Sequence, residues 1–311
     1  GRQAVRRGSA TASRDVNTLR LLSERRHENV LELNAHCLAS GENCDLRLCT
    51  LRACYGGNLG TLLGGGERDR EGGRGGQSQL LEACRHFGRQ IASALSHTHS
   101  LKIAHRDIKP DNVLVDECSA GLGACYPDGD VRRWRCILAD CGSAKNVSEA
   151  RRSSPYVTTL NYRAPELFFA ATHYTYAPDV WSFGCLLAGV LLSGKRLFEE
   201  PGELERTEEQ NNSHHLGLLM RHLGLPSEHE LLAMNGDFAA SSHSVIEWLR
   251  HAPIAQASRR SWEREIVEAV SPSLPADARF RLAALLKILR AIFQYKPRAR
   301  PTATELAAAL L

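Results

Sequence analysis

The sequence predicts an α+β fold in which a small β-rich region precedes a larger, mostly helical one. Two observations support this prediction. Three strand-like segments and a single helical segment fill the first 63 residues. After residue 77, apolar residues recur mainly at the three- and four-residue spacing of amphipathic helices. The 311 residues suffice for one large domain or two moderate ones.

Composition narrows the class of partner. The chain is 43% hydrophobic and 24% charged, as is typical of a soluble globular protein. Its net charge of +4 is too small to indicate nucleic acid or a membrane surface as a partner, so we expect neither. The longest apolar run, CLLAGVLL, is too short to span a bilayer, and nothing resembles a secretory signal.

The cysteines also indicate the compartment. None of the ten forms a Cys-x-x-Cys pair, so we expect reduced thiols in the cytoplasm or nucleus. The closest grouping is interpreted as strand residues rather than as a zinc site; it comprises Cys37, Cys44, Cys49 and Cys54.

Residues 1–55 are predicted to form a small region of strands and one helix. The segment QAV is strand-like, and residues 13–30 are predicted to be helical, with Val16, Leu19 and Leu22 on one apolar face. The segments VLELNAHCL and CDLRLCTL are then predicted to be strands.

Residues 56–311 are predicted to form the large helical lobe, with insertions at 64–77 and 117–136. The first insertion holds only glycine, charged and polar residues, which indicates a flexible loop. The second contains the basic and aromatic run RRWR, which is interpreted as solvated surface or, alternatively, as a docking site. The segment APDVWSFGCLLAGVLLSG is apolar nearly all round, which predicts a buried central helix.

The chemically informative segments are HRDIKPDN, residues 105–112, and ILADCGSAK, residues 137–145. The first supplies a base, a cation and a neutral oxygen ligand in Asp107, Lys109 and Asn112. The second adds Asp140, and two such oxygen donors are suited to a hard cation such as Mg²⁺. Any one of these residues alone could be an ordinary solvated loop residue.

The order of these motifs resembles the catalytic domain of eukaryotic protein kinases. HRDIKPDN is similar to the catalytic loop, DCGSAK stands in the place of D-F-G, and APE follows at residues 164–166. DVWSFGCLLAGVL and KPRARPTATEL resemble the central and last helices of that family. The stretch from SPYVTTLNYRAPEL to GKRLF most resembles the group of cyclin-dependent, MAP, glycogen synthase and CDC-like kinases. The fold implied is a two-lobed α+β kinase fold, with residues 1–55 as an incomplete small lobe and residues 56–311 as the large lobe.

The resemblance implies a serine/threonine kinase that uses Mg²⁺ and ATP to phosphorylate protein substrates. Asp107 would orient the substrate hydroxyl and accept its proton, and Lys109 would neutralise the transferring phosphoryl group. Asn112 and Asp140 would hold the metal. Thr159 would bond to both Asp107 and Lys109.

Two further contacts follow from the same resemblance. Glu166 would form a structural ion pair with Arg300, and Asp179 would bond to the backbone of the catalytic loop.

The resemblance also points to regulation. Ser154 and Tyr156 are candidate phosphorylation sites, and phosphates there could pair with Arg106 and Arg163. The alternative is that Ser154 and Tyr156 are a turn residue and a packed aromatic. A regulatory protein partner would be compatible with this group of kinases.

The first residues depart from the family pattern, so the chain is expected to be amino-terminally truncated or divergent. No glycine-rich loop precedes Arg6, which stands where a lysine belongs, and Thr18 occupies the place of the partner glutamate unless a register shift brings in Asp15. Cys141 replaces the phenylalanine of D-F-G. These departures support the alternative of a pseudokinase that acts as a scaffold or binding module.

The adenine-binding segment is predicted within LCTLRACYGGNL. Leu51 would guard the back of the pocket, and Arg52, Ala53 and Cys54 would offer backbone groups to the base. The alternative for Leu51 is plain strand core.

Overall fold

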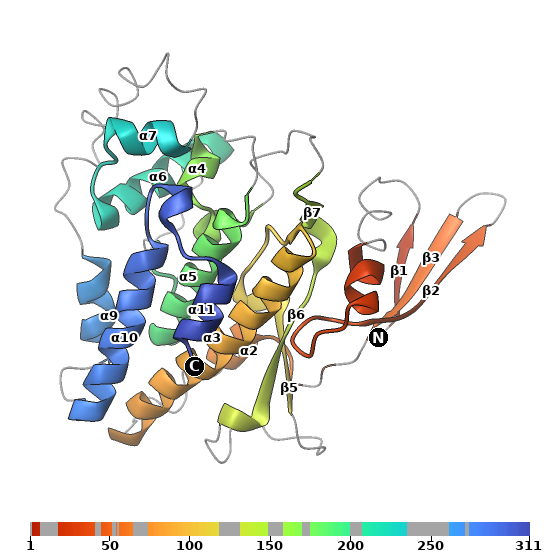
Figure 1. Cartoon of the computed structure of the whole chain (residues 1–311), viewed down its shortest axis with the longest axis horizontal. Helices are drawn as coiled ribbons and strands as arrows, with labels where there is room; N and C mark the ends of the chain where they lie inside the picture. Colours follow the sequence, from red (N-terminus) through yellow and green to blue (C-terminus); the bar gives the residue numbers. More distant parts are fainter. Residues whose placement is uncertain are drawn as a thin grey trace.

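A computed structural model of the chain describes residues 2–6, 18–40, 45–51, 54, 56–64, 74–117, 131–148, 158–169, 175–199, 207–234, 261–270 and 274–311. Within these ranges a small sheet with one helix stands beside a larger, mostly helical body (Figure 1). The arrangement matches the two-lobed α+β fold expected from the sequence.

The small lobe contains one antiparallel sheet in the order β1-β3-β2. Its strands are β1 (Arg2–Arg6), β2 (Leu33–Ser40) and β3 (Asp45–Leu51), which confirms all three predicted strands. The pairing of β2 with β3 shifts register between Leu33 and Ala35, where β2 enters the sheet. Residues 18–24 are helical and lie beside the sheet, which confirms part of the helix predicted over residues 13–30. The prediction was wrong for residues 25–30, which form turns and an isolated β-bridge to Leu138.

The helices of the large lobe are α2 (Leu59–Gly64), α3 (Arg74–Ser100), α4 (Pro165–Phe168), α5 (Ala177–Leu191), α6 (Glu208–Leu223), α7 (Glu228–Met234), α9 (Trp262–Val270), α10 (Ala276–Ile292) and α11 (Ala303–Ala309). The large lobe also contains two short antiparallel strand pairs: β4 (Ile103–Ala104) with β7 (Lys145–Asn146), and β5 (Val113–Glu117) with β6 (Trp134–Leu138). Short 3-10 turns are η2 (Pro110–Asn112), η3 (Val131–Arg133), η4 (Cys141–Ser143), η6 (Leu160–Tyr162) and η8 (Pro297–Ala299).

The structure shortens both predicted insertions. Residues 65–73 and 118–130 lie outside the described residues, but residues 74–77 form the first turn of α3. At the other insertion, η3 and β6 take up residues 131–136. Trp134 is buried while Arg132 and Arg133 are exposed, so the predicted basic and aromatic surface patch loses its aromatic member to the core.

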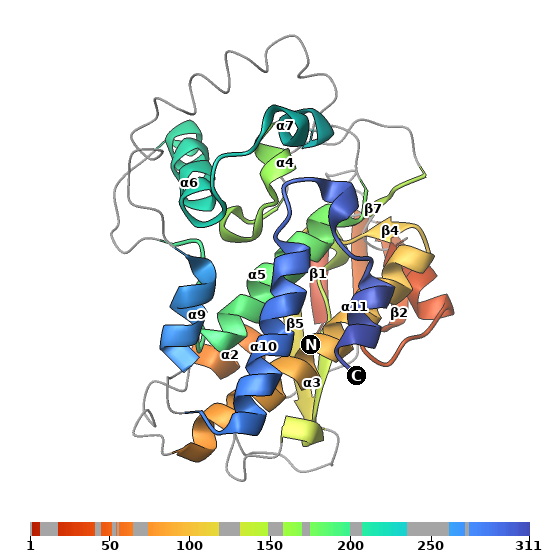
Figure 2. The ribbon, with the colours of Figure 1, turned by 60° about the vertical axis from the view of Figure 1, so that its left-hand side comes forward.

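Helix α5 is the centre of the large lobe, as its all-round apolar sequence predicts. It is covered by α3 on one side and by α10 on another, with α11 alongside α3 (Figure 2). Two glycines allow this close packing. A Cβ on Gly88 would lie 2.7 Å from Leu187 Cδ2, and one on Gly184 would lie 2.5 Å from Ile292 Cγ2.

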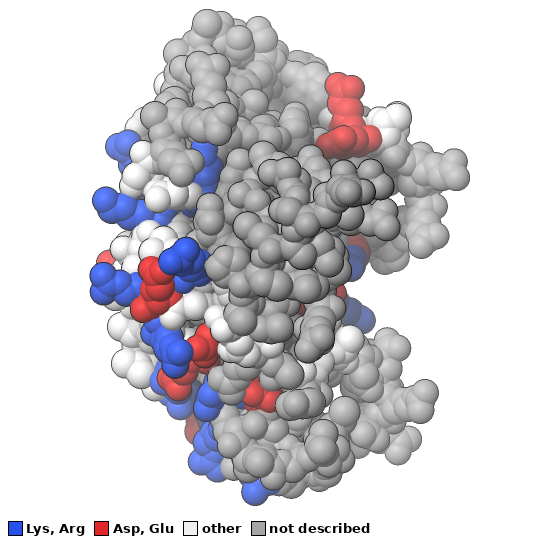
Figure 3. Space-filling model, turned by 90° about the vertical axis from the view of Figure 1, so that its right-hand side faces the viewer, with Lys and Arg blue, Asp and Glu red and all other residues white. Residues whose placement is uncertain are grey.

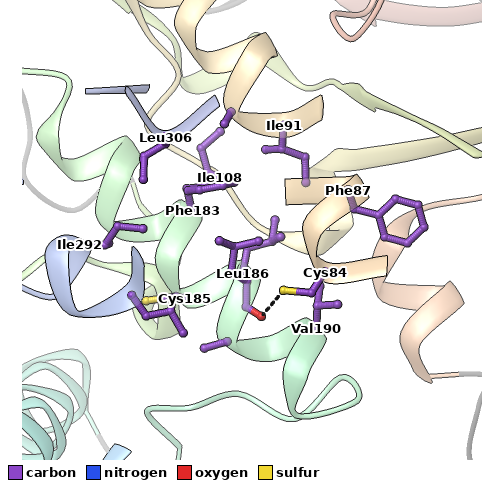
Figure 4. Close-up of a cluster of buried hydrophobic side chains, with 14 of the residues drawn as sticks. Cys84, Phe87, Ile91, Ile108, Phe183, Cys185, Leu186, Val190, Ile292 and Leu306 are labelled. Carbon is purple, nitrogen blue, oxygen red and sulfur yellow. Dashed lines mark hydrogen bonds between the residues drawn. The ribbon is translucent and has the colours of Figure 1, made fainter. Parts of the chain in front are cut away.

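The core between these helices is filled by aliphatic, aromatic and cysteine side chains (Figure 4). The Cys84 thiol points at α5 and donates to the backbone carbonyl of Leu187 at 3.7 Å. Burial raises the pKa of Cys84 to about 12, so this cysteine is a packed, unreactive thiol.

The two lobes are joined by a buried polar network around Asn29, in the turn that follows the small-lobe helix. Asn29 Nδ2 donates to Gln90 Oε1 of α3 at 2.9 Å and to the carbonyl of Cys136 in β6 at 2.8 Å. The Asn29 carbonyl accepts from Leu138 N at 2.8 Å, and Leu31 N donates to the Leu138 carbonyl at 2.9 Å. The turn is therefore anchored to α3 and β6 of the large lobe.

Basic and acidic side chains are intermixed along the left edge of the face shown in Figure 3, where the residues are described.

Candidate active site

The loop His105–Asn112 is held to α5 by the buried carboxylate of Asp179. Its Oδ2 accepts from His105 N at 2.8 Å and its Oδ1 from Arg106 N at 2.7 Å. His99 Nε2 lies 2.9 Å from the same Oδ2. Arg106 adopts a φ of 71°, a left-handed conformation that non-glycine residues adopt only when their surroundings enforce it. The predicted contact of Asp179 with the loop backbone is confirmed.

Charge distribution explains why Asp179 can be buried. Burial by itself raises the pKa of this carboxyl, but the bonds and charges of His99 and His105 and the bond from Arg106 N outweigh burial, so its pKa lies below the usual value. Asp179 is therefore ionised at neutral pH, and the charge is balanced by donors rather than by water.

Replacing Asp179 with asparagine should lower the free energy of unfolding by about 1.5–3 kcal/mol, since bonds to a charged acceptor become bonds to a neutral amide whose nitrogen faces donors. Denaturant unfolding measures this effect. Asp277→Asn on the exposed side of α10 is the matched control. A loss no larger than that of the control would contradict the anchoring role.

Four of the predicted site residues meet around the Asp107 carboxylate. Oδ1 accepts from Thr159 Oγ1 at 2.8 Å and from Thr159 N at 3.3 Å. Oδ2 accepts from Asn112 Nδ2 at 2.9 Å and pairs with Lys109 Nζ at 2.9 Å. Lys109 Nζ also donates to Thr159 Oγ1 at 2.9 Å, so the predicted contacts of Thr159 with both residues are confirmed.

These contacts set the ionisation of Asp107. Burial raises its pKa, but the bonds from Lys109 and Thr159, with the charge of Lys109, outweigh burial and hold the pKa below its usual value. At neutral pH the site therefore combines a carboxylate, an ammonium and a hydroxyl within hydrogen-bonding distance.

A backbone hydrogen bond links Asn112 to the residue that precedes Asp140. The Asn112 carbonyl accepts from Ala139 N at 2.9 Å, so the end of the loop is fixed to the residue just before Asp140. His105 strengthens this link because its Nε2 donates to the Ala139 carbonyl at 2.9 Å. Burial lowers the pKa of His105, so its ring is neutral at pH 7.

The side chains of Asn112 and Asp140 can offer oxygens to a divalent cation. The Asn112 amide nitrogen is committed to Asp107, which leaves the amide oxygen as the ligand atom. Asp140 is exposed, has a φ of 61°, and accepts from Gly142 N at 3.2 Å. One carboxylate and one amide oxygen fit Mg²⁺, which takes few protein ligands and completes its shell with water and phosphate oxygens. Among the residues described, no three His, Cys, Asp or Glu side chains are grouped to hold a metal ion.

Cys141 follows Asp140 at the start of η4 and is buried in the main hydrophobic core. Because cysteine is smaller than the phenylalanine that it replaces in the D-F-G motif, we expect its side chain to fill less of the space at this position. In the structure the surrounding core leaves only 4% of the surface of Cys141 exposed to solvent.

An apolar cluster lies directly beside these polar groups. Leu51 and Cys54, both predicted, pack against three buried residues that sequence reasoning missed: Leu31, Ile137 and Ala139. Leu114, also missed, packs against the same three residues. Three of the missed residues could have been predicted from their closeness in sequence to the catalytic motifs. Leu114 follows Asn112 by two positions, and the segment 137–139 immediately precedes Asp140. Ala53 and Arg52 lie outside the described residues.

The structure describes only part of the two positions at which the kinase family has a paired lysine and glutamate. Arg6 is the last residue of β1, paired with Leu46, and its side chain lies outside the description. Thr18 is half-buried in the first turn of the small-lobe helix.

The candidate phosphorylation sites Ser154 and Tyr156 lie outside the described residues. The arginines proposed to pair with them are both buried. Arg106 Nε donates to the Ser143 carbonyl. Arg163 donates to the Thr158 carbonyl at 2.9 Å and to Asn212 Oδ1 of α6 at 2.6 Å.

A buried ion pair supports the segment that carries Thr159. Arg300 Nη1 and Nη2 each lie 2.7 Å from a separate carboxylate oxygen of Glu166 in α4, which confirms the predicted pair. The guanidinium also lies over the ring of Trp181, 5.0 Å from its centroid.

None of the described helices is long and apolar enough to cross a bilayer.

The chain is similar in sequence to several known proteins. Protein kinase gsk31 of Schizosaccharomyces pombe is 37% identical over 156 residues, which cover 50% of this chain and 34% of that protein. Serine/threonine-protein kinase RIM11/MSD1 of Saccharomyces cerevisiae is 31% identical over 197 residues, 63% of this chain and 46% of that protein. Mitogen-activated protein kinase 6 of Arabidopsis thaliana is 37% identical over 162 residues, 52% of this chain and 35% of that protein. The chain thus matches less than half the length of each of these relatives.

The family model described as protein kinase domain matches residues 5–310, nearly the whole chain. It includes the Asp107 cluster, Asp140 and the Glu166–Arg300 pair. The chain belongs to the protein kinase domain family.

Proposed function

We propose that the chain transfers the γ-phosphate of ATP to serine or threonine hydroxyls of proteins. The observation that carries the proposal is the assembled set of Asp107, Lys109, Asn112 and Thr159, whose bonds are all 3.3 Å or shorter. A fold retained only as a scaffold has no need of a carboxylate that is ionised, partly buried and aligned by three neighbours.

Each residue of this set has a separate role in the proposal. Asp107 accepts the proton of the substrate hydroxyl, and Thr159 holds its carboxylate in one orientation. Lys109 places a positive charge beside the phosphoryl group in transit, where it stabilises the developing negative charge. The bond of Asn112 to Asp107 couples the metal-binding residue to the base.

The cofactors proposed are ATP and Mg²⁺. The Asn112 amide oxygen and the Asp140 carboxylate would bind Mg²⁺, which supplies charge neutralisation for the phosphates. The apolar cluster of Leu51, Cys54 and Leu114 would receive the adenine ring, with backbone groups of Ala53 and Cys54 toward its edge. Arg6 would contribute positive charge near the phosphates.

Protein substrates and a regulatory protein partner are part of the proposal, with cytoplasmic or nuclear localisation. Phosphorylation of Ser154 or Tyr156 would favour the active state by pairing with Arg106 and Arg163. For Arg163 this requires the exchange of its bonds to the Thr158 carbonyl and Asn212 for bonds to phosphate.

Phosphate transfer to a generic basic protein, measured with labelled ATP in the presence and absence of Mg²⁺, tests the function. We expect Mg²⁺-dependent labelling of serine or threonine. A parallel thermal titration with Mg²⁺-ATP should raise the unfolding midpoint, because a ligand that binds only the folded state stabilises it. A midpoint shift without labelling would favour the pseudokinase, and neither signal would favour a scaffold without a nucleotide site.

A further inference from the structure

Two stacked imidazoles fasten the turn after the small-lobe helix to α3. The ring centroids of His27 in the turn and His97 in α3 are 4.9 Å apart, and the rings are inclined by 25°. Neither histidine takes part in the proposed phosphate transfer. Both stand beside the Asn29 network that joins the lobes.

Hydrogen bonding defines the protonation state of His27. Asn29 N lies 3.1 Å from His27 Nδ1, and a backbone N–H can only donate. Nδ1 must therefore carry a lone pair. The proton of the neutral ring sits on Nε2, which lies 3.1 Å from Ser93 Oγ. A second proton, on Nδ1, would remove the acceptor for Asn29 and turn a bond into a contact between two donors.

The surroundings of His27 oppose that second proton. The groups facing it from α3 are Ser93 and the titratable His97, and Glu28 is the nearby charge on its own turn. Burial first, and then the charge of His97, lower the pKa of His27, while Glu28 acts in the opposite direction. His97 Nε2 is itself buried without a hydrogen-bond partner among the described atoms.

The bond from Asn29 N matters because Asn29 is the centre of the inter-lobe network. Its side chain is bound to Gln90 and Cys136, and its carbonyl to Leu138 in β6. Residue 29 is almost fully buried, so an unpaired N–H there cannot turn to water. Loss of this bond therefore loosens the turn from both α3 and β6.

We infer that His27 and His97 form an acid-sensitive latch between the small lobe and α3. Protonation of His27 at Nδ1 breaks its hydrogen bond with Asn29 N and places a cation against the ring of His97. The small lobe is then held less tightly to α3 and β6. The direction in which stability changes with pH follows from the difference in the pKa of His27 between the folded and unfolded states. A histidine that is harder to protonate in the folded state contributes stability above its unfolded pKa of about 6.5, and this contribution is lost as pH falls below that value. The latch does not depend on whether the chain transfers phosphate.

Residue-resolved hydrogen exchange of the full chain, without nucleotide, tests the latch between pH 8 and pH 5.5. The readout is the protection factor, corrected for intrinsic exchange, of the amides of Asn29, Leu31 and Leu138. Below about pH 6.5 we expect protection to fall by at most about tenfold per pH unit, the limit for one linked proton. His27→Asn, whose side-chain oxygen can accept from the N–H two residues on, should show no such fall. The exposed His229→Asn should behave like the unmodified chain.

A fall in His27→Asn equal to that of the unmodified chain, or no fall in either, would overturn the latch. If His27→Asn does not fold, His97→Phe gives a second test. It keeps an aromatic ring on His27 but removes the imidazole that lowers the pKa of His27, so the midpoint of the fall should move to higher pH. An unchanged midpoint would overturn the coupling between the two rings.

Discussion

Replacing Asp107 with asparagine should slow phosphate transfer by about 10²–10⁴-fold, the usual contribution of a positioned general base. An amide cannot accept the hydroxyl proton, and the structure adds a second reason. The Asp107 carboxylate accepts from Thr159 through one oxygen and from Asn112 and Lys109 through the other. An asparagine must point its NH₂ group at one of these sets of donors, so Lys109 or Thr159 loses its position as well. Initial rates with labelled ATP measure the loss.

Two companion variants separate chemistry from folding. Asp277→Asn makes the same substitution on exposed α10 and should retain the full rate. Thr159→Ser keeps the hydroxyl and should lose less activity than Thr159→Val, which removes the hydroxyl bonds to Asp107 and Lys109 and keeps only the backbone bond to Asp107. Equal labelling by the unmodified chain and Asp107→Asn would show that the labelling does not come from this site.

Replacing Glu166 with alanine should lower the free energy of unfolding by about 3–5 kcal/mol, because it leaves a buried guanidinium without its counter-charge. The side chain of Arg300 has no solvent exposure, so water cannot replace the carboxylate. Its bonds to the carbonyls of Gln294 and Ala177 remain, but these are neutral acceptors. Denaturant unfolding at neutral pH measures the effect.

The double variant Glu166→Ala with Arg300→Met should be less destabilised than Glu166→Ala alone, since no buried charge is left uncompensated. The exposed pair of Arg20 and Glu24 provides the control, and Glu24→Ala should barely change the unfolding free energy. Equal effects of Glu166→Ala and Glu24→Ala would contradict the structural role of the buried pair.

The site was predictable wherever local sequence order fixes contacts. Asp107, Lys109 and Asn112 lie within six consecutive positions of one loop, so their proximity follows from the chain itself. Thr159 and Asp179 are distant in sequence and were predicted only through the family resemblance. Neither periodicity nor composition would have paired them with the loop.

The sequence did not predict the buried polar residues that belong to no recognisable motif. Gln90 lies on a helix whose pattern predicts an apolar face, and nothing in that pattern distinguishes a glutamine that faces β6 from one that faces solvent. The start of α3 was also predicted too late, because glycine costs about 1 kcal/mol in a helix and GRGG therefore indicates a loop. Helix formation at Arg74 shows that the remainder of a long, well-packed helix can outweigh that cost.

The complete burial of α5 has a consequence for synthesis of the chain. The ribosome produces α3 before α5, but α10 emerges about a hundred residues later. At translation rates of roughly 5–20 residues per second, the apolar side of α5 that packs against α10 therefore stays exposed for several seconds. During those seconds the nascent chain presents a hydrophobic helix that favours self-association. We expect early release, or a stop before residue 292, to yield an aggregating product, and full-length yield to depend on chaperones that shield α5 until α10 arrives.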